Sequence, residues 1–170
     1  MALRNIKNCF DPVLRKQCEI VKNIDEKLVR LSEDMVETTL AAPGIGLAAN
    51  QIGIPWRIFV VNLGLETESD NLVTLINPEI TAMEGSELGE EGCLSIPEVV
   101  AKVNRATQVE LKAVDLNGKD VRYETTGLLA RALQHEMDHL NGILFWDSLG
   151  KIKRDILKRK FKKKLKEQGE

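Results

Sequence analysis

The segment around which this chain must fold is TGLLARALQHEMDHLN, residues 126–141, which has the pattern of one amphipathic helix. A threonine at its start can serve as the N-cap, and Gly142 ends it, because glycine readily adopts the left-handed conformation that closes a helix. His135 and His139 are four residues apart, so both imidazoles project from one face, one turn from each other. They are the only two histidines of the chain.

The pentapeptide HEMDH at 135–139 has the spacing of a hydrolytic metal site. Two neutral imidazoles can bind one divalent ion, and Glu136, directly after the first histidine, can reach water on that ion as a general base. A chance His-x-x-x-His pattern on a solvated face is the alternative. Leu128 and Ala132 share the histidine face, which indicates that this face points toward the core and favours the metal site.

A third protein ligand must come from elsewhere, because a catalytic ion usually has three and keeps one position open. Phe145 stands where HExxHxxGxxH would place a third histidine, and the remaining downstream glutamates, Glu167 and Glu170, lie at the end of a basic tail. Upstream, Cys93 follows a glycine that permits close backbone approach, and a thiolate binds borderline or soft divalent ions strongly. The alternative is that Cys93 is a buried, inert cysteine. This interpretation suits Cys9 and Cys18 better than Cys93.

Residues 44–51, GIGLAANQ, resemble a phosphate-binding loop only superficially. No Gly-Lys-Ser/Thr follows, and the segment follows a helix rather than a strand. The two glycines suggest a backbone edge that another group approaches closely, and Gln51 offers a neutral amide donor suited to an oxyanion. Taken alone, the segment is interpreted by default as a tight connection between a helix and a strand.

The remaining elements predict an α+β fold, because helices and strands are segregated along the chain. A helix over 24–42 has Asp25 as its cap and apolar residues at spacings of three and four, and a third helix fills the tail. A hairpin turn is expected at Asn117-Gly118 and a loop at 64–71. Strands are predicted at 57–62, 72–77, 79–84, 99–103, 107–115, 120–124 and 143–145. We expect antiparallel or mixed sheets packed around the central metal-binding helix, with a C-terminal helix outside them.

Composition indicates one domain in a reducing compartment. The 170 residues suffice for a single core, and no apolar run has the length of a signal peptide or membrane span. Cys9, Cys18 and Cys93 are too few for a disulfide framework, which favours the cytoplasm. Residues 151–170 carry ten Lys/Arg and three Asp/Glu, whereas residues 1–150 are acidic. We therefore expect one catalytic domain, 1–150, extended by a basic amphipathic helix, 151–170.

Three motifs together resemble the bacterial peptide deformylases: GIGLAANQ at 44–51, EGCLS at 91–95 and QHEMDH at 134–139. The run DPVLR at 11–15 and Arg105 are also similar to that family. The resemblance covers nearly the whole chain and includes the helical extension. It implies hydrolytic removal of the formyl group from the N-terminal formylmethionine of nascent peptides, with release of formate.

The resemblance also implies roles for individual residues, by motif position. The metal ligands would be Cys93, His135 and His139, and the general base would be Glu136. The oxyanion would be held by the Gln51 amide and the Leu94 backbone N–H. The substrate-binding residues expected around them are Gly44, Ile45, Gly46, Glu91, Gly92, Leu128 and Ala132. The family commonly uses ferrous iron in vivo, and zinc, nickel or cobalt can occupy the site.

The basic tail suggests a partner, because seven net positive charges would bind RNA with strong salt dependence. The expected partner is the ribosome, from which the substrate emerges. The alternative is a solvated amphipathic helix docked on the body through one apolar face, formed by Ile152, Ile156, Leu157, Phe161 and Leu165. Two other functions stay open beside the deformylase. One is a zinc endopeptidase built on the same helix. The other is a non-enzymatic ribosome-binding module with a structural metal. The presence of Glu136 argues against it, because a structural metal site needs no general base.

Overall fold

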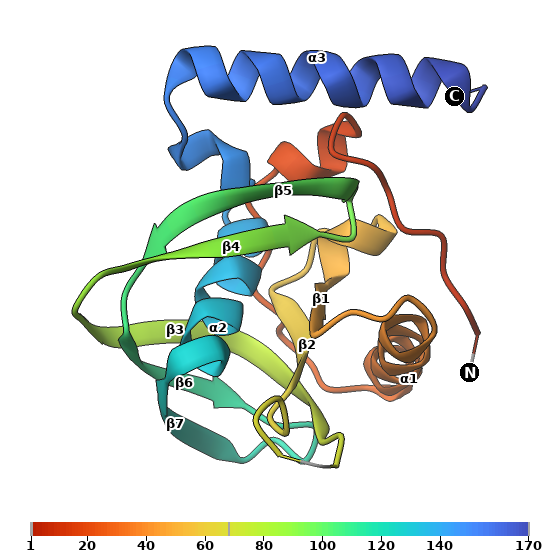
Figure 1. Ribbon diagram of the computed structural model, residues 1–170. Helices are drawn as coiled ribbons and strands as arrows, with labels where there is room; N and C mark the ends of the chain where they lie inside the picture. The colour runs from red at the N-terminus through yellow and green to blue at the C-terminus, as the bar shows by residue number, and fades with distance from the viewer. Residues whose placement is uncertain (1, 68, 170) are drawn as a thin grey trace.

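The computed structural model describes residues 2–67 and 69–169 of the chain (Figure 1). Three α-helices, seven strands and three short 3-10 helices are seen in this described part. Their order is η1 (Pro12–Arg15), α1 (Glu26–Ala41), β1 (Gly46–Ala48), η2 (Ala49–Ile52), β2 (Ile58–Asn62), β3 (Leu72–Glu84), β4 (Glu87–Cys93), β5 (Ile96–Arg105), β6 (Gln108–Val114), β7 (Asp120–Thr126), α2 (Gly127–Leu140), η3 (Phe145–Ser148) and α3 (Lys151–Glu167). The predicted α+β class is confirmed.

The strands form two separate antiparallel sheets. Five of them are hydrogen-bonded in the order β1-β2-β3-β6-β7, and β4 pairs with β5 as a two-stranded hairpin. Helix α2 lies between the hairpin and the larger sheet (Figure 1). The predicted central position of the histidine-bearing helix is therefore confirmed.

The sheet-facing side of α2 carries the apolar residues of that helix. Leu133, Met137 and Leu140 pack on Phe59 and Leu111 of the larger sheet. These burials remove apolar surface from water, which is the main favourable term in folding. The helix is thereby fixed along its length, and its opposite face is left to the hairpin.

Helix α1 covers the other side of strands β1 and β2. Its Leu28, Leu31 and Met35 are buried against Ile58 and Val60. As predicted, the Asp25 side chain caps this helix, accepting a 3.0 Å hydrogen bond from the Leu28 backbone N–H.

The predicted strands differ from the structure in several places, and the short strand β1 was also not predicted. The runs 72–77 and 79–84 are one strand, β3, because Asn77 adopts a left-handed φ of 50° and a bulge carries the chain past Pro78. The segment predicted as a strand at 143–145 instead leads into η3, where the Asp147 carboxylate accepts a 2.9 Å hydrogen bond from the Leu144 N–H. Strand β4 was not predicted, because its sequence ELGEEGC lacks apolar alternation.

The tail helix α3 packs on the hairpin side of the molecule through part of its expected apolar face. Phe161 is buried against Trp146, and Leu157 and Leu165 pack against the same cluster. The other expected contact, Ile152, is 80% exposed, and Ile156 is exposed as well. Apolar packing therefore anchors α3 from Leu157 onward and leaves its first turns without such contacts. In the described part of the chain no helix combines the length and apolar character that crossing a membrane requires.

Candidate metal centre

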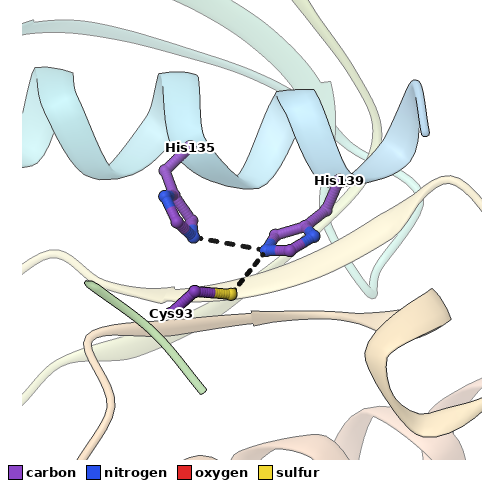
Figure 2. A group of neighbouring side chains, drawn as sticks. All are labelled: Cys93, His135 and His139. Carbon is purple, nitrogen blue, oxygen red and sulfur yellow. Dashed lines mark hydrogen bonds between the residues drawn. The ribbon is translucent and has the colours of Figure 1, made fainter. Parts of the chain in front are cut away.

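Cys93, His135 and His139 converge on one point beneath α2 (Figure 2). The Cys93 Sγ lies 3.3 Å from the His139 Nε2, which lies 3.2 Å from the His135 Nε2. Around a tetrahedral zinc-sized ion, two imidazole nitrogens stand about 3.3 Å apart and a nitrogen and a thiolate about 3.5 Å apart. These two distances match the spacing around one divalent ion, and all three donor atoms lie within 4.8 Å of one another.

The local sequence explains why the thiol faces the histidines. Cys93 ends β4, and the pairing register shifts between Gly92 and Cys93, so that Cys93 pairs with Ile96 across a tight turn. This irregularity releases the cysteine side chain from the alternation of the strand. A β-carbon on Gly92 would meet nothing of this protein closer than 3.5 Å, so the protein's own packing does not require a glycine there.

A buried carboxylate orients the first histidine. Glu91 Oε1 lies 2.9 Å from the His135 Nδ1, and its two oxygens also accept hydrogen bonds from Arg105 and Arg131. Burial would raise the pKa of Glu91, but the hydrogen bonds from His135 and Arg105 and the charge of Arg105 lower it to about 2. The carboxylate is therefore ionised, and it leaves the other ring nitrogen, Nε2, directed toward the His139 Nε2.

The second histidine is held neutral by its surroundings. His139 is buried, and burial together with the charge of His135 lowers the pKa of His139 well below its usual range. A neutral imidazole is the form that binds a metal. Burial would lower the pKa of His135 too, but the hydrogen bonds to Cys93 and Glu91 raise it. A metal ion entering the site therefore displaces a proton.

Glu136 is the other titratable group of the site. It is buried, its Oε2 has no hydrogen-bond partner among the described residues, and burial raises the pKa of its carboxyl to about 7. A nearby cation favours the ionised form of such a group. A carboxylate with a free oxygen beside the ion can accept a proton and give it back.

The side-chain amide of Gln51 lies across the site from α2. Its Oε1 accepts a 2.9 Å hydrogen bond from the Ala48 N–H, which points the Nε2 toward Ser95 Oγ at 3.1 Å and Cys93 Sγ at 3.7 Å. The amide is thereby fixed as a donor facing the metal site. Ser95 was not singled out from the sequence, although it lies inside the EGCLS motif.

A pocket of about 430 Å³ opens beside these groups. It brings together nearly all the residues expected from the sequence: Gly44, Ile45, Gly46, Gln51, Glu91, Gly92, Cys93, Leu94, Leu128, Ala132, His135 and Glu136. His139 lies behind this lining. Leu128 is 45% exposed at the pocket, whereas Ala132 and His139 on the same face of α2 are 1% exposed. The predicted burial of this face therefore holds for Ala132 and His139 and not for Leu128.

Five lining residues were missed from the sequence: Pro43, Glu90, Pro97, Glu98 and Arg131. One signal was available for the last of these, because Arg131 lies one turn before His135 on the same helical face. The glycines of the 44–51 segment serve close approaches, as expected. A β-carbon on Gly46 would lie 2.9 Å from Glu136 Oε1, and one on Gly44 would lie 2.7 Å from a methyl carbon of Leu94. The segment is therefore more than a connection between elements.

Residues 3–155 match the family described as polypeptide deformylase. The chain belongs to that family. It is 50% identical over 167 residues to the peptide deformylase of Syntrophobacter fumaroxidans, covering 98% of each chain, and 47% identical to that of Thermodesulfovibrio yellowstonii, covering 96% of this chain and 99% of the other. The predicted family and the enzymatic activity of a peptide deformylase, with formylated nascent peptides as substrates, are thereby confirmed.

Solved structures agree with this assignment. The peptide deformylase of Legionella pneumophila superimposes with a TM-score of 0.92 at 41% identity, covering 99% of this chain and 98% of the other. A peptide deformylase from Ehrlichia chaffeensis in complex with actinonin has a TM-score of 0.91 at 37% identity, covering 96% and 98%. The deformylase family and the Cys-His-His group support a bound divalent metal ion.

Proposed function

We propose that this deformylase hydrolyses the formamide of N-terminal formylmethionine at an ion held by Cys93, His135 and His139. The observation that carries this proposal is the convergence of the three donor atoms, at 3.2 and 3.3 Å, on the wall of the pocket. The bound ion would supply Lewis acidity, lowering the pKa of water and polarising the formyl carbonyl. All other roles are assigned to side chains and backbone groups of the protein.

Glu136 moves the proton in both halves of the reaction. Its unpartnered Oε2 takes a proton from the attacking water as the new C–O bond forms at the formyl carbon. The same oxygen then donates that proton to the peptide nitrogen as the C–N bond breaks. Formate and a free N-terminal amine leave, so that the carboxylate is restored.

Two donors hold the oxyanion of the tetrahedral intermediate. The Gln51 Nε2 faces the site from one side, and the Leu94 backbone N–H lies on the turn directly after Cys93. A preorganised donor of this kind typically contributes about 10²–10³-fold in rate. Ser95 aids indirectly, because its hydroxyl is the atom to which the Gln51 amide is hydrogen-bonded.

The substrate lies between two backbone edges. The segment 44–46, which leads into β1, offers its edge for strand addition by the peptide, and Glu91 and Gly92 form the opposite wall. The methionine side chain occupies the apolar part of the pocket, where Ile45 and Leu128 supply contacts and Ala132 leaves room. Ile45 and Leu128 are 41% and 45% exposed, which is surface that a substrate side chain would bury.

The decisive experiment is formate release from formyl-Met-Ala by protein purified without oxygen. Wild-type protein should release one formate per amine formed. Glu136→Gln, which keeps the shape of the side chain but removes the base, should bind metal normally and be nearly inactive. Wild-type protein that holds a metal ion and releases no formate would contradict the proposed function.

Ferrous iron is our proposal for the physiological ion. Thiolate and imidazole donors accept several divalent ions, so the ligand set alone allows zinc, nickel or cobalt. Iron bound to a thiolate is sensitive to oxygen, so the activity of natively purified protein should decay in air and return with Fe²⁺ and a reductant. Activity that is stable in air, in protein containing only zinc, would overturn the assignment.

We further propose that the enzyme works in the cytoplasm as one catalytic domain, residues 1–150, extended by the helix at 151–170. We also propose that this helix, α3, binds the ribosome. The lysines on the exposed side of α3 suit RNA phosphates, and the buried Phe161 ties the helix to the body. Replacing Lys153, Lys160 and Lys163 with glutamine keeps that packing. The triple variant should lose ribosome affinity at low salt and keep wild-type activity on formyl-Met-Ala. Unchanged affinity would reject the ribosome contact.

A further inference from the structure

Arg131 links the metal-bearing helix to both strands of the β4–β5 hairpin. Its Nη1 donates 2.8 Å hydrogen bonds to Glu91 Oε2 and to the Val103 carbonyl, and a longer one of 3.4 Å to the Gly89 carbonyl. Its Nη2 donates to the Glu87 carbonyl at 2.9 Å. The side chain is only 13% exposed, so these bonds are largely shielded from water.

Gly89 makes this arrangement sterically feasible. A β-carbon at position 89 would lie 2.7 Å from the Arg131 Nη2 and 2.8 Å from its Cζ. The guanidinium therefore lies against the bare backbone of β4, in space that any other residue would fill. Gly89 and Arg131 form an interlocking pair between the hairpin and α2.

The position of the hairpin matters because it is one wall of the substrate pocket. Glu91 and Gly92 belong to β4, whereas Leu128 and Ala132 of the opposite wall belong to α2. The hairpin is not hydrogen-bonded into the five-stranded sheet, and a two-stranded sheet has little stability of its own. Side-chain links between α2 and the hairpin therefore contribute to the distance between the two walls.

We propose that Arg131, seated on Gly89, is a positioning residue that sets the width of the pocket and so determines how strictly the enzyme selects the first side chain of its substrate. The inference rests on the proposed function, since it takes the pocket to hold that side chain. Arg131 also lines the pocket itself, next to Ala132. Its charged end is occupied by four acceptors of the hairpin and is not free to bind substrate.

The metal site should be insulated from the loss of Arg131. Arg105 holds Glu91 independently, with its Nε 2.8 Å from Oε2 and its Nη2 3.0 Å from Oε1, and it is anchored in turn to Asp138 at 2.6 Å. Glu91 would therefore keep its hydrogen bond to His135 without Arg131. Arg131 thus acts on substrate binding, whereas Arg105 acts on the orientation of the metal ligand.

The test compares Arg131→Met with wild type in the metal-loaded enzyme, using formyl-Met-Ala and formyl-Phe-Ala. The KM for formyl-Met-Ala should rise about tenfold, and kcat should change less than about threefold. The reason is that the variant loses binding energy that the substrate and the transition state share equally. The preference for methionine over phenylalanine, measured as the ratio of the two kcat/KM values, should fall about tenfold. The reason is that Arg131 no longer holds the hairpin wall of the pocket at a fixed distance from α2. The absorption spectrum of the cobalt-loaded variant should match that of wild type. Arg105→Gln is the matched control, and it should alter the cobalt spectrum.

Gly89→Ala gives an independent check through a double-mutant cycle. In the wild-type background it should raise KM and relax selectivity in the same way, because the methyl group displaces the guanidinium. In the Arg131→Met background it should add little. Additive effects, or an Arg131→Met enzyme with wild-type KM and selectivity and only a lower Tm, would overturn the inference. Wild-type protein without any formate release would instead refute the proposed function.

Discussion

The side-chain amide of Asn50 donates a 2.6 Å hydrogen bond to the main-chain carbonyl of His139. Asn50 is completely buried on η2, and the carbonyl belongs to the last turn of α2, where helix carbonyls lack partners within the helix. The bond therefore joins the glycine-rich segment to the helix that carries both histidines. It fixes the end of α2 on which His139 lies.

Asn50→Leu should destabilise the protein and weaken metal binding. Removing the donor takes one hydrogen bond from the His139 carbonyl, which still accepts from the Gly142 N–H at 3.1 Å, so we expect a cost of about 0.5–1.5 kcal/mol. Urea unfolding of the metal-free protein measures the stability, and competition with a chelator measures the metal affinity. Asn104→Leu, the same change at an exposed position of β5, is the control and should change stability by less than about 0.5 kcal/mol. Wild-type metal affinity in Asn50→Leu would show that the bond does not support His139.

Gly46→Ala should lower kcat by about 10²-fold, because a small displacement of a catalytic group has a large cost. The new methyl group would lie 2.9 Å from Glu136 Oε1 and 3.0 Å from the Val60 carbonyl. The backbone carbonyl cannot swing away, so the carboxylate must move. Gly150→Ala, where a β-carbon has no neighbour within 4 Å, is the control. Full activity in a folded Gly46→Ala enzyme would contradict the proposed position of the base.

Thiol labelling should distinguish the three cysteines. Burial raises the pKa of Cys9 to about 12 and that of Cys18 to about 11, so both thiols stay protonated and unreactive at pH 8. Cys93 opens to the pocket. Mass spectrometry after brief alkylation should find one modified residue, Cys93, and only after the metal has been chelated. Rapid labelling of metal-loaded wild type at Cys93 would argue against its role as a ligand.

Asp147→Asn should reduce stability at neutral pH and have less effect in acid. Burial would raise the pKa of Asp147, but hydrogen bonds from Arg15 and from the Leu144 N–H lower it. A depressed carboxyl pKa stabilises the folded state above the unfolded pKa of about 4, and that contribution disappears as pH falls through the folded value. Because the pair is partly exposed, we expect about 0.5–1 kcal/mol at pH 7.

Urea unfolding of wild type and Asp147→Asn at pH 7 and at pH 3 checks this prediction. The difference in unfolding free energy should narrow at the lower pH. Glu26→Gln removes an exposed ion pair with Arg30 and serves as the control, with a smaller effect at both pH values. A difference independent of pH would mean that the charge of Asp147 is not responsible.

The elements that could be predicted are those in which the pattern of apolar residues and caps along the sequence indicates the secondary structure and the buried side. Helix α1 shows its apolar spacing and its Asp25 cap, and β2 is a continuous buried run. Strand β4 could not be predicted, because its glutamates and glycines are typical of loops. It becomes a strand by pairing with β5 and by accepting hydrogen bonds from Arg131.

The same distinction applies to the site. The spacing of His135 and His139 indicates a metal ion because a helix places them together without any tertiary contact. Arg131 was overlooked because an arginine on a helix is usually solvated. Its meaning depends on Gly89, which is 42 residues away in the sequence and adjacent only in the folded chain.

By itself the sequence determined the α+β class, the metal-binding helix and the resemblance to the deformylases, because these depend on local periodicity and on short motifs. The tertiary structure alone decided that the Cys93 Sγ lies 3.3 Å from the His139 Nε2, that Glu91 is shared by two arginines, and that Asn50 supports His139. The physical reason is that these contacts join segments separated by more than ten residues, and no local preference specifies their distances.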